Sequence, residues 1–475
     1  MKAPQLRFIP LLLAVGLAGC DDAPRFTQAE PGEAQSAGDA TVRKFDVNAY
    51  SMPSANLSPV RRLDFSVGNS FFRSPWVIAP STTTARDGLG PLFNTNACQN
   101  CHIKDGRGHP PETDAVNAVS MLVRLSLPDS EPYAQVIERL GVVPEPVYGV
   151  QLQDMAIPGV VPEGKVRVSY EPVPVRFKDG TVVELRKPQL QISQLGYGAL
   201  HPQTQFSARV APPMIGLGLL EAIPEQAILD NAKAQAQSSG PIKGRPNQVW
   251  DDAQGKTVLG RFGWKAGQPN LNQQNVHAFS GDMGLTTSLR PADDCTPSQT
   301  DCLQAPNGNG LGGEPEVSDN ILRLVLFYTR NLGVPARRDV DSPQVLAGKN
   351  LFYQAGCQGC HVPQYVTSSQ AAEPEQRNQT IRPYTDLLLH DMGPGLADQR
   401  SEFKAGGQDW RTPPLWGIGL NETVSGHTQY LHDGRARNLL EAVLWHGGEA
   451  QAAQQQVLQF NAEQRAALLA FLNAL

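Results

Sequence analysis

The chain carries one pentapeptide pattern twice, as Cys98-Gln99-Asn100-Cys101-His102 and as Cys357-Gln358-Gly359-Cys360-His361. In each copy two thiols stand three residues apart and can bond the two vinyl groups of one porphyrin, while the imidazole that follows can reach its iron. A thioredoxin-like redox pair would need a βαβ context, and a zinc site would need both pairs to converge on one metal. The pattern therefore predicts two covalently bound c-type haems, with the histidines of the two motifs as proximal iron ligands.

Repeats around the motifs predict one haem in each half of the chain. A Leu-Phe pair precedes each motif, with its Phe five residues before the first cysteine, and one stretch recurs without gaps at residues 211–221 and 412–422. The repetition predicts two cytochrome c-like haem domains related by internal duplication, at residues 46–340 and 341–475. The expected fold class is mainly α and loop-rich, because 44 glycines and 39 prolines imply long loops between modest helices.

Local patterns predict the helix that closes each half and one β insertion. Ile321–Leu332 is apolar and has two N-cap candidates, Ser318 and Asp319, while residues 462–475 follow an Asn and precede a Gln at capping-box spacing. Period-two segments on either side of a Lys-Asp-Gly turn predict a small β-hairpin inserted at about 145–195, in the N-terminal half.

The first residues predict export and a lipid anchor. Lys2 and Arg7 form a positive region before a short apolar stretch, and Leu17-Ala18-Gly19-Cys20 resembles the lipobox of bacterial lipoproteins. We therefore expect a signal peptide at residues 1–19, a lipid on Cys20 and a polar linker over residues 20–45, so that the protein faces the periplasm from a membrane of the bacterial cell envelope. Cleavage by an ordinary signal peptidase near Cys20 is the alternative.

The charge balance and the remaining cysteines narrow the functional classes. The formal net charge of -6 provides no basic field for nucleic acid, so a nucleic-acid partner is not expected. Cys295 and Cys302 lie in one polar loop, and an exported protein meets an oxidising compartment, so we predict a disulfide between them. Two free thiols are the alternative.

Five stretches of the chain resemble one known family: Asp87–Phe93, Arg261–Ala266, Tyr384–Gly393, Leu431–Ala436 and Trp445–Glu449. From about Phe65 to Leu475 the sequence resembles the di-haem oxidoreductases, some of which are labelled peroxidases or thiol oxidoreductases. These are distant relatives of the bacterial di-haem cytochrome c peroxidases and of the di-haem enzyme that matures methylamine dehydrogenase. The resemblance implies an oxidoreductase of the peroxidase type.

The resemblance also implies different roles for the two haems. In the peroxidase relatives, one haem stores an electron and the other, whose sixth position is open or can open, reduces peroxide. His446 stands where the peroxidases place an axial methionine, which implies His361/His446 ligation and an electron store in the C-terminal half. Met392 is a competing ligand, and a purely structural role for His446 stays open.

The same comparison implies that the N-terminal haem is the reactive one. Trp264 matches a tryptophan that lies between the haems of the peroxidases, and residues 273–284 match the segment that there supplies a distal glutamine and a catalytic glutamate. The implied catalytic candidates are, in order, Asp282, Gln273 and His277, because peroxide reduction needs a carboxylate or imidazole to move a proton. A loop role for Asp282 and a ligand role for His277 stay open, as does a calcium ion of the kind that the relatives hold between their domains.

Three functions are compatible with these residues. The first is an envelope oxidoreductase that takes electrons from a small periplasmic cytochrome or cupredoxin and reduces peroxide or a related oxidant at an open haem. The second is a non-catalytic electron-transfer lipoprotein, which requires two closed haems. In the third, the open haem oxidises a partner protein or ferrous iron. The state of the N-terminal haem pocket distinguishes the second function from the other two.

Overall fold

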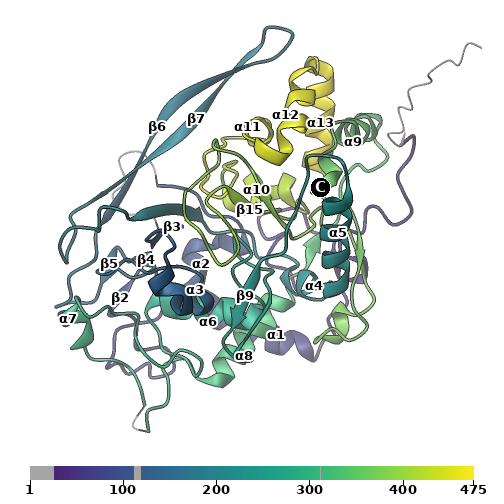
Figure 1. Ribbon diagram of the computed structural model, residues 1–475. Helices are drawn as coiled ribbons and strands as arrows, with labels where there is room; N and C mark the ends of the chain where they lie inside the picture. Colours follow the sequence, from purple (N-terminus) through teal and green to yellow (C-terminus); the bar gives the residue numbers. More distant parts are fainter. Residues whose placement is uncertain (1–25, 112–118, 311) are drawn as a thin grey trace, which may run out of the picture.

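The computed structural model describes residues 26–111, 119–310 and 312–475, and its elements are short and joined by long loops (Figure 1). Helices account for 31% of the residues and strands for 18%. The fold is therefore mixed and loop-rich rather than mainly α. None of the described helices is long and apolar enough to cross a bilayer. The predicted signal peptide and Cys20 lie outside the described residues.

Two pairs of crossing helices lie beside the two motifs. Helix α1 (Arg61–Arg73) packs on α8 (Asp319–Arg330), and α9 (Pro343–Gln354) packs on α13 (Ala462–Ala474). Each crossing needs a glycine: a Cβ on Gly68 would lie 2.2 Å from the Leu324 carbonyl oxygen, and one on Gly348 would lie 1.9 Å from that of Ala467. The backbones of both pairs can therefore approach more closely than a larger residue would allow.

The N-caps of α8 and α13 follow the sequence prediction. The Ser318 side chain accepts from the backbone N–H of Ile321, and Asn461 with Gln464 forms a complete capping box. Two further helices are as long, α5 (Glu225–Gln237) and α6 (Leu271–Met283). The others are short: α2 (Cys98–Cys101), α3 (Ala134–Leu140), α4 (Leu217–Glu221), α7 (Thr300–Leu303), α10 (Asn421–Ser425), α11 (Leu439–Leu444) and α12 (Gln451–Leu458).

Most strands form two- or three-stranded sheets that fix loops. The pairs are β1 (Thr41–Val42) with β11 (Val334–Pro335), β2 (Leu92–Phe93) with β5 (Met155–Ala156), β3 (Met121–Ser126) with β4 (Gln151–Leu152) and β8 (Gln205–Val210), β9 (Gln248–Asp251) with β10 (Lys256–Leu259), β12 (Tyr365–Val366) with β13 (Thr380–Ile381), and β14 (Leu389–Asp391) with β15 (Asp409–Arg411). The two Leu-Phe pairs are not equivalent, because the first forms β2 and the second lies within α9.

The predicted hairpin is present and longer than expected. Strands β6 (Lys165–Arg176) and β7 (Val182–Ser193) pair along their whole length, and Figure 1 shows the hairpin reaching toward the C-terminal helices. Its turn docks there: the Lys178 N–H donates to the Leu458 carbonyl at 3.0 Å, and Arg465 pairs with Asp179 at 2.8 Å. The hairpin thus ties the N-terminal half to the C-terminal half.

The N-terminal segment departs from the predicted polar linker. From residue 26 onward it packs on the C-terminal half, where the Phe26 N–H donates to Asn350 at 2.7 Å and Lys349 pairs with Glu33 at 2.9 Å. Strand β1 also runs parallel to β11. Small residues make this close packing feasible, since Ala37 and Ala40 are buried. The segment is therefore part of the folded body.

We expect the hairpin contact to contribute measurably to stability. Phe177 is 2% exposed, and the Arg465 guanidinium lies 4.4 Å from its ring centre. Phe177→Ala should lower the free energy of unfolding by about 3 kcal/mol because it leaves a cavity under the turn. Chemical denaturation followed by circular dichroism measures this loss.

Val182→Ala is the matched control, because Val182 lies near the same turn with 47% of its surface exposed. Its effect should stay within about 0.5 kcal/mol. Equal effects of the two substitutions would show that the turn is not docked in solution.

Candidate functional site

One cavity of about 660 Å³ connects the two CxxCH motifs. Its wall contains every residue that the sequence singled out for haem attachment, iron ligation or catalysis: Cys98, Cys101, His102, Trp264, Gln273, His277, Asp282, Cys357, Cys360, His361, Met392 and His446. Residues up to 348 positions apart in the sequence, from Cys98 to His446, therefore face one shared space.

The first motif holds its histidine in a defined orientation. α2 carries both cysteines, and His102 follows as the C-cap. The His102 Nδ1 donates to the Pro212 carbonyl at 2.8 Å, and its Nε2 has no hydrogen-bond partner among the described residues. Burial lowers the pKa of His102 to about 4. The imidazole is thus neutral near pH 7 and can offer Nε2 to a metal.

The second motif repeats this arrangement. The His361 Nδ1 donates to the Tyr384 carbonyl at 2.9 Å, and burial lowers the pKa of His361 to about 4. A phenylalanine from the neighbouring helix lies beside each ring: Phe72 is 6.2 Å from His102 and Phe352 is 6.3 Å from His361, centre to centre. Both imidazoles are therefore held by a backbone carbonyl at Nδ1, which leaves Nε2 for a metal.

The motif thiols lack the properties of a redox dithiol. Burial raises the pKa of Cys98 and of Cys357 to about 12, whereas reactive CxxC pairs have lowered thiol pKa values. Neither motif forms a disulfide, while Cys295 and Cys302 form the predicted one. Two thiols, one neutral imidazole and an adjoining cavity are the donor set that a c-type haem requires, so the residues of each motif fit this cofactor.

Two candidate sixth ligands lie in the cavity wall near the second motif. The His446 Nδ1 donates to the Ala442 carbonyl at 2.8 Å, and no described residue bonds to its Nε2. After burial and the bond to Tyr384, nearby His446 is a further influence on the pKa of His361, so the two rings are close. Met392 also lines the cavity, with its backbone N–H bonded to the Gln408 carbonyl. Both remain candidates.

The distal candidates near the first motif differ in what they can do. Gln273 is committed to structure, because its amide bonds both Trp250 and Asp252. Both ring nitrogens of His277 are also engaged, Nδ1 with Gln268 and Nε2 with Asp252, at 2.9 Å each. Neither side chain is free to serve as a ligand or proton carrier without breaking these bonds.

Asp282 is the most available distal candidate. Its Oδ1 accepts from Gln151 at 3.0 Å, and within the described residues Oδ2 has no partner. Burial raises the pKa of Asp282 above its usual value, opposed by the charge of Arg124. Asp282 is close enough to Cys98 and Cys101 to raise their pKa values. A carboxyl group therefore lies beside the first motif.

Trp264 lies between the parts of the chain that carry the two motifs. Its indole N–H donates to the Val210 carbonyl at 2.8 Å, and its carbonyl accepts from the backbone N–H of Arg411 at 2.9 Å. The Arg107 guanidinium lies 5.2 Å from the ring centre. Trp264 therefore contacts a loop that follows the first motif and a strand of the C-terminal half.

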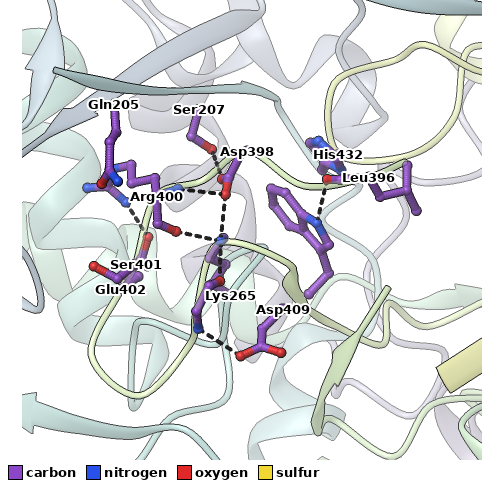
Figure 2. Close-up of polar contacts among 12 residues, drawn as sticks. Gln205, Ser207, Lys265, Leu396, Asp398, Arg400, Ser401, Glu402, Asp409 and His432 are labelled. Atoms are coloured by element: carbon purple, nitrogen blue, oxygen red, sulfur yellow. Dashed lines mark hydrogen bonds and ion pairs between the residues drawn. The ribbon is translucent and has the colours of Figure 1, made fainter. Parts of the chain in front are cut away.

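A buried charged cluster is centred on Lys265, the residue that follows Trp264 in the sequence (Figure 2). The Lys265 ammonium donates to Asp398 at 2.8 Å and to the Arg400 carbonyl at 2.7 Å. Burial lowers the pKa of Lys265 to about 8. Its Nζ also lies 4.6 Å from the ring centre of Trp410, which stacks on His432 at 3.6 Å. The cluster fixes the loop at residues 396–409 against the cavity.

His390 is a charged residue of the site that was not predicted from sequence, although it lies in Tyr384–Gly393, one of the stretches that resemble the family. The structure places it 1% exposed between Asp386 and Glu449, at 2.9 and 2.7 Å, with Cys360 at 3.5 Å. Burial opposes protonation, but these partners outweigh it and raise the pKa of His390 to about 12. Asp386 and His390 are close in the sequence, so their contact could have been expected from their spacing. Glu449 lies far along the chain and could not have been paired with them from sequence.

Comparison with known families agrees with this donor set. The family model described as "Di-haem oxidoreductase, putative peroxidase" matches residues 32–475. The chain belongs to the di-haem oxidoreductase family. No curated protein and no solved structure matches it. The family name implies two haems, in agreement with the two CxxCH sites of this oxidoreductase.

The expectation of a bound calcium ion rests on the sequence resemblance alone. No group of three or more His, Cys, Asp or Glu side chains in residues 26–111, 119–310 and 312–475 is arranged to hold a metal ion.

Loss of one motif should remove one haem. In Cys98→Ser/Cys101→Ser, no thiol remains to bond the first porphyrin, so the haem-to-protein ratio should fall from two to one. Intact-mass spectrometry and a pyridine haemochrome assay measure this ratio.

Cys295→Ser/Cys302→Ser is the control, since it removes two other cysteines and should retain both haems. An unchanged ratio in the motif variant would contradict covalent attachment at Cys98 and Cys101.

Proposed function

We propose that this oxidoreductase is a peroxidase-type enzyme of the bacterial envelope. In this proposal electrons from a small periplasmic cytochrome or cupredoxin enter at the C-terminal haem, and peroxide or a related oxidant is reduced at the N-terminal haem. The haems, when bound, supply the redox-active iron. A lipid on Cys20 would hold the protein at a membrane facing the periplasm. The observation that carries the proposal is the difference between the two ends of the cavity.

The C-terminal end offers a second imidazole to an iron. His446 is oriented by its bond to Ala442, and its Nε2 has no partner among described residues. His361 and His446 together suit a closed, low-spin site, and bis-imidazole ligation favours a lower potential than His/Met ligation. These properties suit an electron store.

The N-terminal end offers a carboxyl group instead of a free imidazole. The nitrogens of His277 are held by Gln268 and Asp252, so closing this site with His277 would break two hydrogen bonds. Asp282 has one oxygen held by Gln151 and the other available. A carboxylate with a raised pKa can accept a proton from one peroxide oxygen and return it to the other. This difference favours a peroxidase over a simple electron carrier.

Structural parallels between the halves support two related haem units, which we propose at residues 46–340 and 341–475. Each proximal histidine lies beside a Phe of the first crossing helix, which itself packs on an aromatic ring of the second. These rings are 5.2 Å apart in both halves, as Phe72 with Tyr328 and Phe352 with Phe471. The recurring stretches also match, because Gly216 and Gly417 both have positive φ, 68° and 74°.

Electron paramagnetic resonance of the oxidised and half-reduced protein tests the proposed function. One high-spin ferric signal, present or produced on half-reduction and lost when hydrogen peroxide is added, would support it. Two low-spin signals indifferent to peroxide in both redox states would refute it and leave a di-haem electron carrier.

His446→Met should convert the C-terminal site to His/Met ligation. One midpoint potential should then rise by a fraction of the roughly 0.8 V range that axial ligands span. Potentiometric titration followed by visible absorption measures the change.

Met392→Leu is the matched control and should leave both potentials unchanged. The opposite pattern, with a shift in Met392→Leu alone, would identify Met392 as the ligand.

Asp282→Asn should lower kcat/KM for peroxide about 10²-fold or more while both haems are retained, because general acid–base catalysis contributes at least this much. Its pH profile provides a second test. The carboxylate must be ionised to accept a proton, so the wild-type rate should fall as the pH falls through the raised pKa of Asp282. The variant should lack this acidic limb.

His277→Gln is the comparison, since His277 is already bonded at both nitrogens and should matter less. A loss below about threefold in Asp282→Asn would exclude Asp282 as the proton carrier.

A further inference from the structure

Buried cations outnumber buried carboxylates in the wall around Trp264. Five cations at least nine-tenths buried lie in this wall or directly behind it: Arg107, Arg209, Lys265, Arg400 and Arg411. All except Lys265 line the cavity. The carboxylates in ion pairs with them are Asp398 and Glu402, while the buried Asp433 and Asp386 act on Arg107 and Arg411 from beyond ion-pair distance. Burying a cation without an anion is costly, so the surplus indicates that the cavity wall binds anions.

The two carboxylates are already used by three of these cations. Glu402 pairs with Arg209 at 2.7 Å and with Arg400 at 2.8 Å. Asp398 pairs with Lys265 at 2.8 Å. In the part of the chain that the structure describes, Arg107 and Arg411 have no carboxylate within ion-pair distance. These two arginines are therefore the unpaired members of the group.

Arg107 makes only neutral contacts. Its Nε donates to the Gln429 carbonyl at 2.8 Å, and its Nη2 donates to the Leu431 carbonyl. Its guanidinium lies over one face of the Trp264 ring. No described residue accepts from Nη1. Arg107 lies five residues after His102, on the loop that follows the first motif.

Arg411 makes the corresponding contacts from the C-terminal half. Its Nε donates to the Gly263 carbonyl at 2.9 Å, and its Nη1 donates to the Thr412 carbonyl at 3.1 Å. Among the described residues, Nη2 has no acceptor. Burial lowers the pKa of Arg107 and of Arg411 to about 10, which still leaves both charged at pH 7. Each half thus presents one such guanidinium next to Gly263-Trp264.

We propose that Arg107 and Arg411 bind carboxylates in the cavity, and that these are haem propionates: Arg107 for the N-terminal haem and Arg411 for the C-terminal haem. The planar guanidinium is suited to such a partner, since its N–H groups match the two carboxylate oxygens. The assignment rests on the proposed haem placement but not on peroxide reduction. A free small carboxylate has the same chemistry, so the test must separate the two sources.

Midpoint potentials of Arg107→Gln and Arg411→Gln holoproteins test the assignment, with titrations repeated in acetate. Loss of a nearby cation favours the ferric state, so a potential should fall. Arg411→Gln should lower the C-terminal potential more than the N-terminal one, and Arg107→Gln should do the reverse.

The haem whose potential moves in His446→Met identifies the C-terminal site. Arg465→Gln is the control, because Arg465 is equally buried but does not line the cavity.

The response to acetate distinguishes the two sources of carboxylate. Wild-type potentials that do not respond to acetate, together with the two shifts, would support propionates. A saturable acetate response in the wild type that both variants lose would assign the arginines to a free carboxylate and overturn the propionate assignment. Potentials unchanged in both variants would overturn the proposal altogether.

The lysine variants keep the test decisive if a glutamine variant yields no holoprotein. Arg107→Lys and Arg411→Lys retain the charge but lose the bidentate contact with a carboxylate. Their haem potentials should therefore shift in the same direction as those of the glutamine variants, but by a smaller amount. A lysine variant whose potentials equal those of the wild type would count against the assignment. A peroxide-inactive protein with the expected shifts would refute the proposed function and leave this inference standing.

Discussion

The guanidinium of Arg107 connects the three parts of the chain on which the cavity depends. Arg107 belongs to the loop after the first CxxCH motif. Its guanidinium lies over the Trp264 ring and donates to the carbonyls of Gln429 and Leu431. A buried charge has lost its hydration, so these two carbonyl acceptors matter to its stability. The contact therefore holds the loop after the first motif, Trp264 and the C-terminal half together at one side of the cavity.

The two proximal histidines show how a sequence motif becomes a site. The CxxCH pattern brings two thiols and an imidazole together, but it leaves the ring free to rotate. The carbonyls of Pro212 and Tyr384 fix the rings, and burial keeps both neutral. The functional difference that we propose between the sites lies elsewhere, in the unbonded Nε2 of His446 at one end and the carboxyl of Asp282 at the other.

Sequence reasoning succeeded where the determining contacts are local. The capping box at Asn461, the hairpin turn at Asp179 and the disulfide at Cys295 each depend on residues within a few positions. It failed where the partners are distant. Nothing local shows that residues 26–33 would pack on α9, or that Glu449 would complete the contacts of His390. The mixed fold was missed in part for the same reason, since three of the seven sheets in the described residues, those of β1, β2 and β3, join remote segments.

The placement of the first described residues has a consequence for the order in which contacts form during biosynthesis. Phe26 is bonded to Asn350, and Arg107 to residues 429 and 431, so these partners are made more than three hundred residues later. Chains grow from the N-terminus, and an early segment cannot complete contacts with residues that do not yet exist. The thiols of Cys98 and Cys101 thus emerge well before the wall that buries them. In this interval the first motif would be accessible for the haem attachment that its CxxCH pattern predicts.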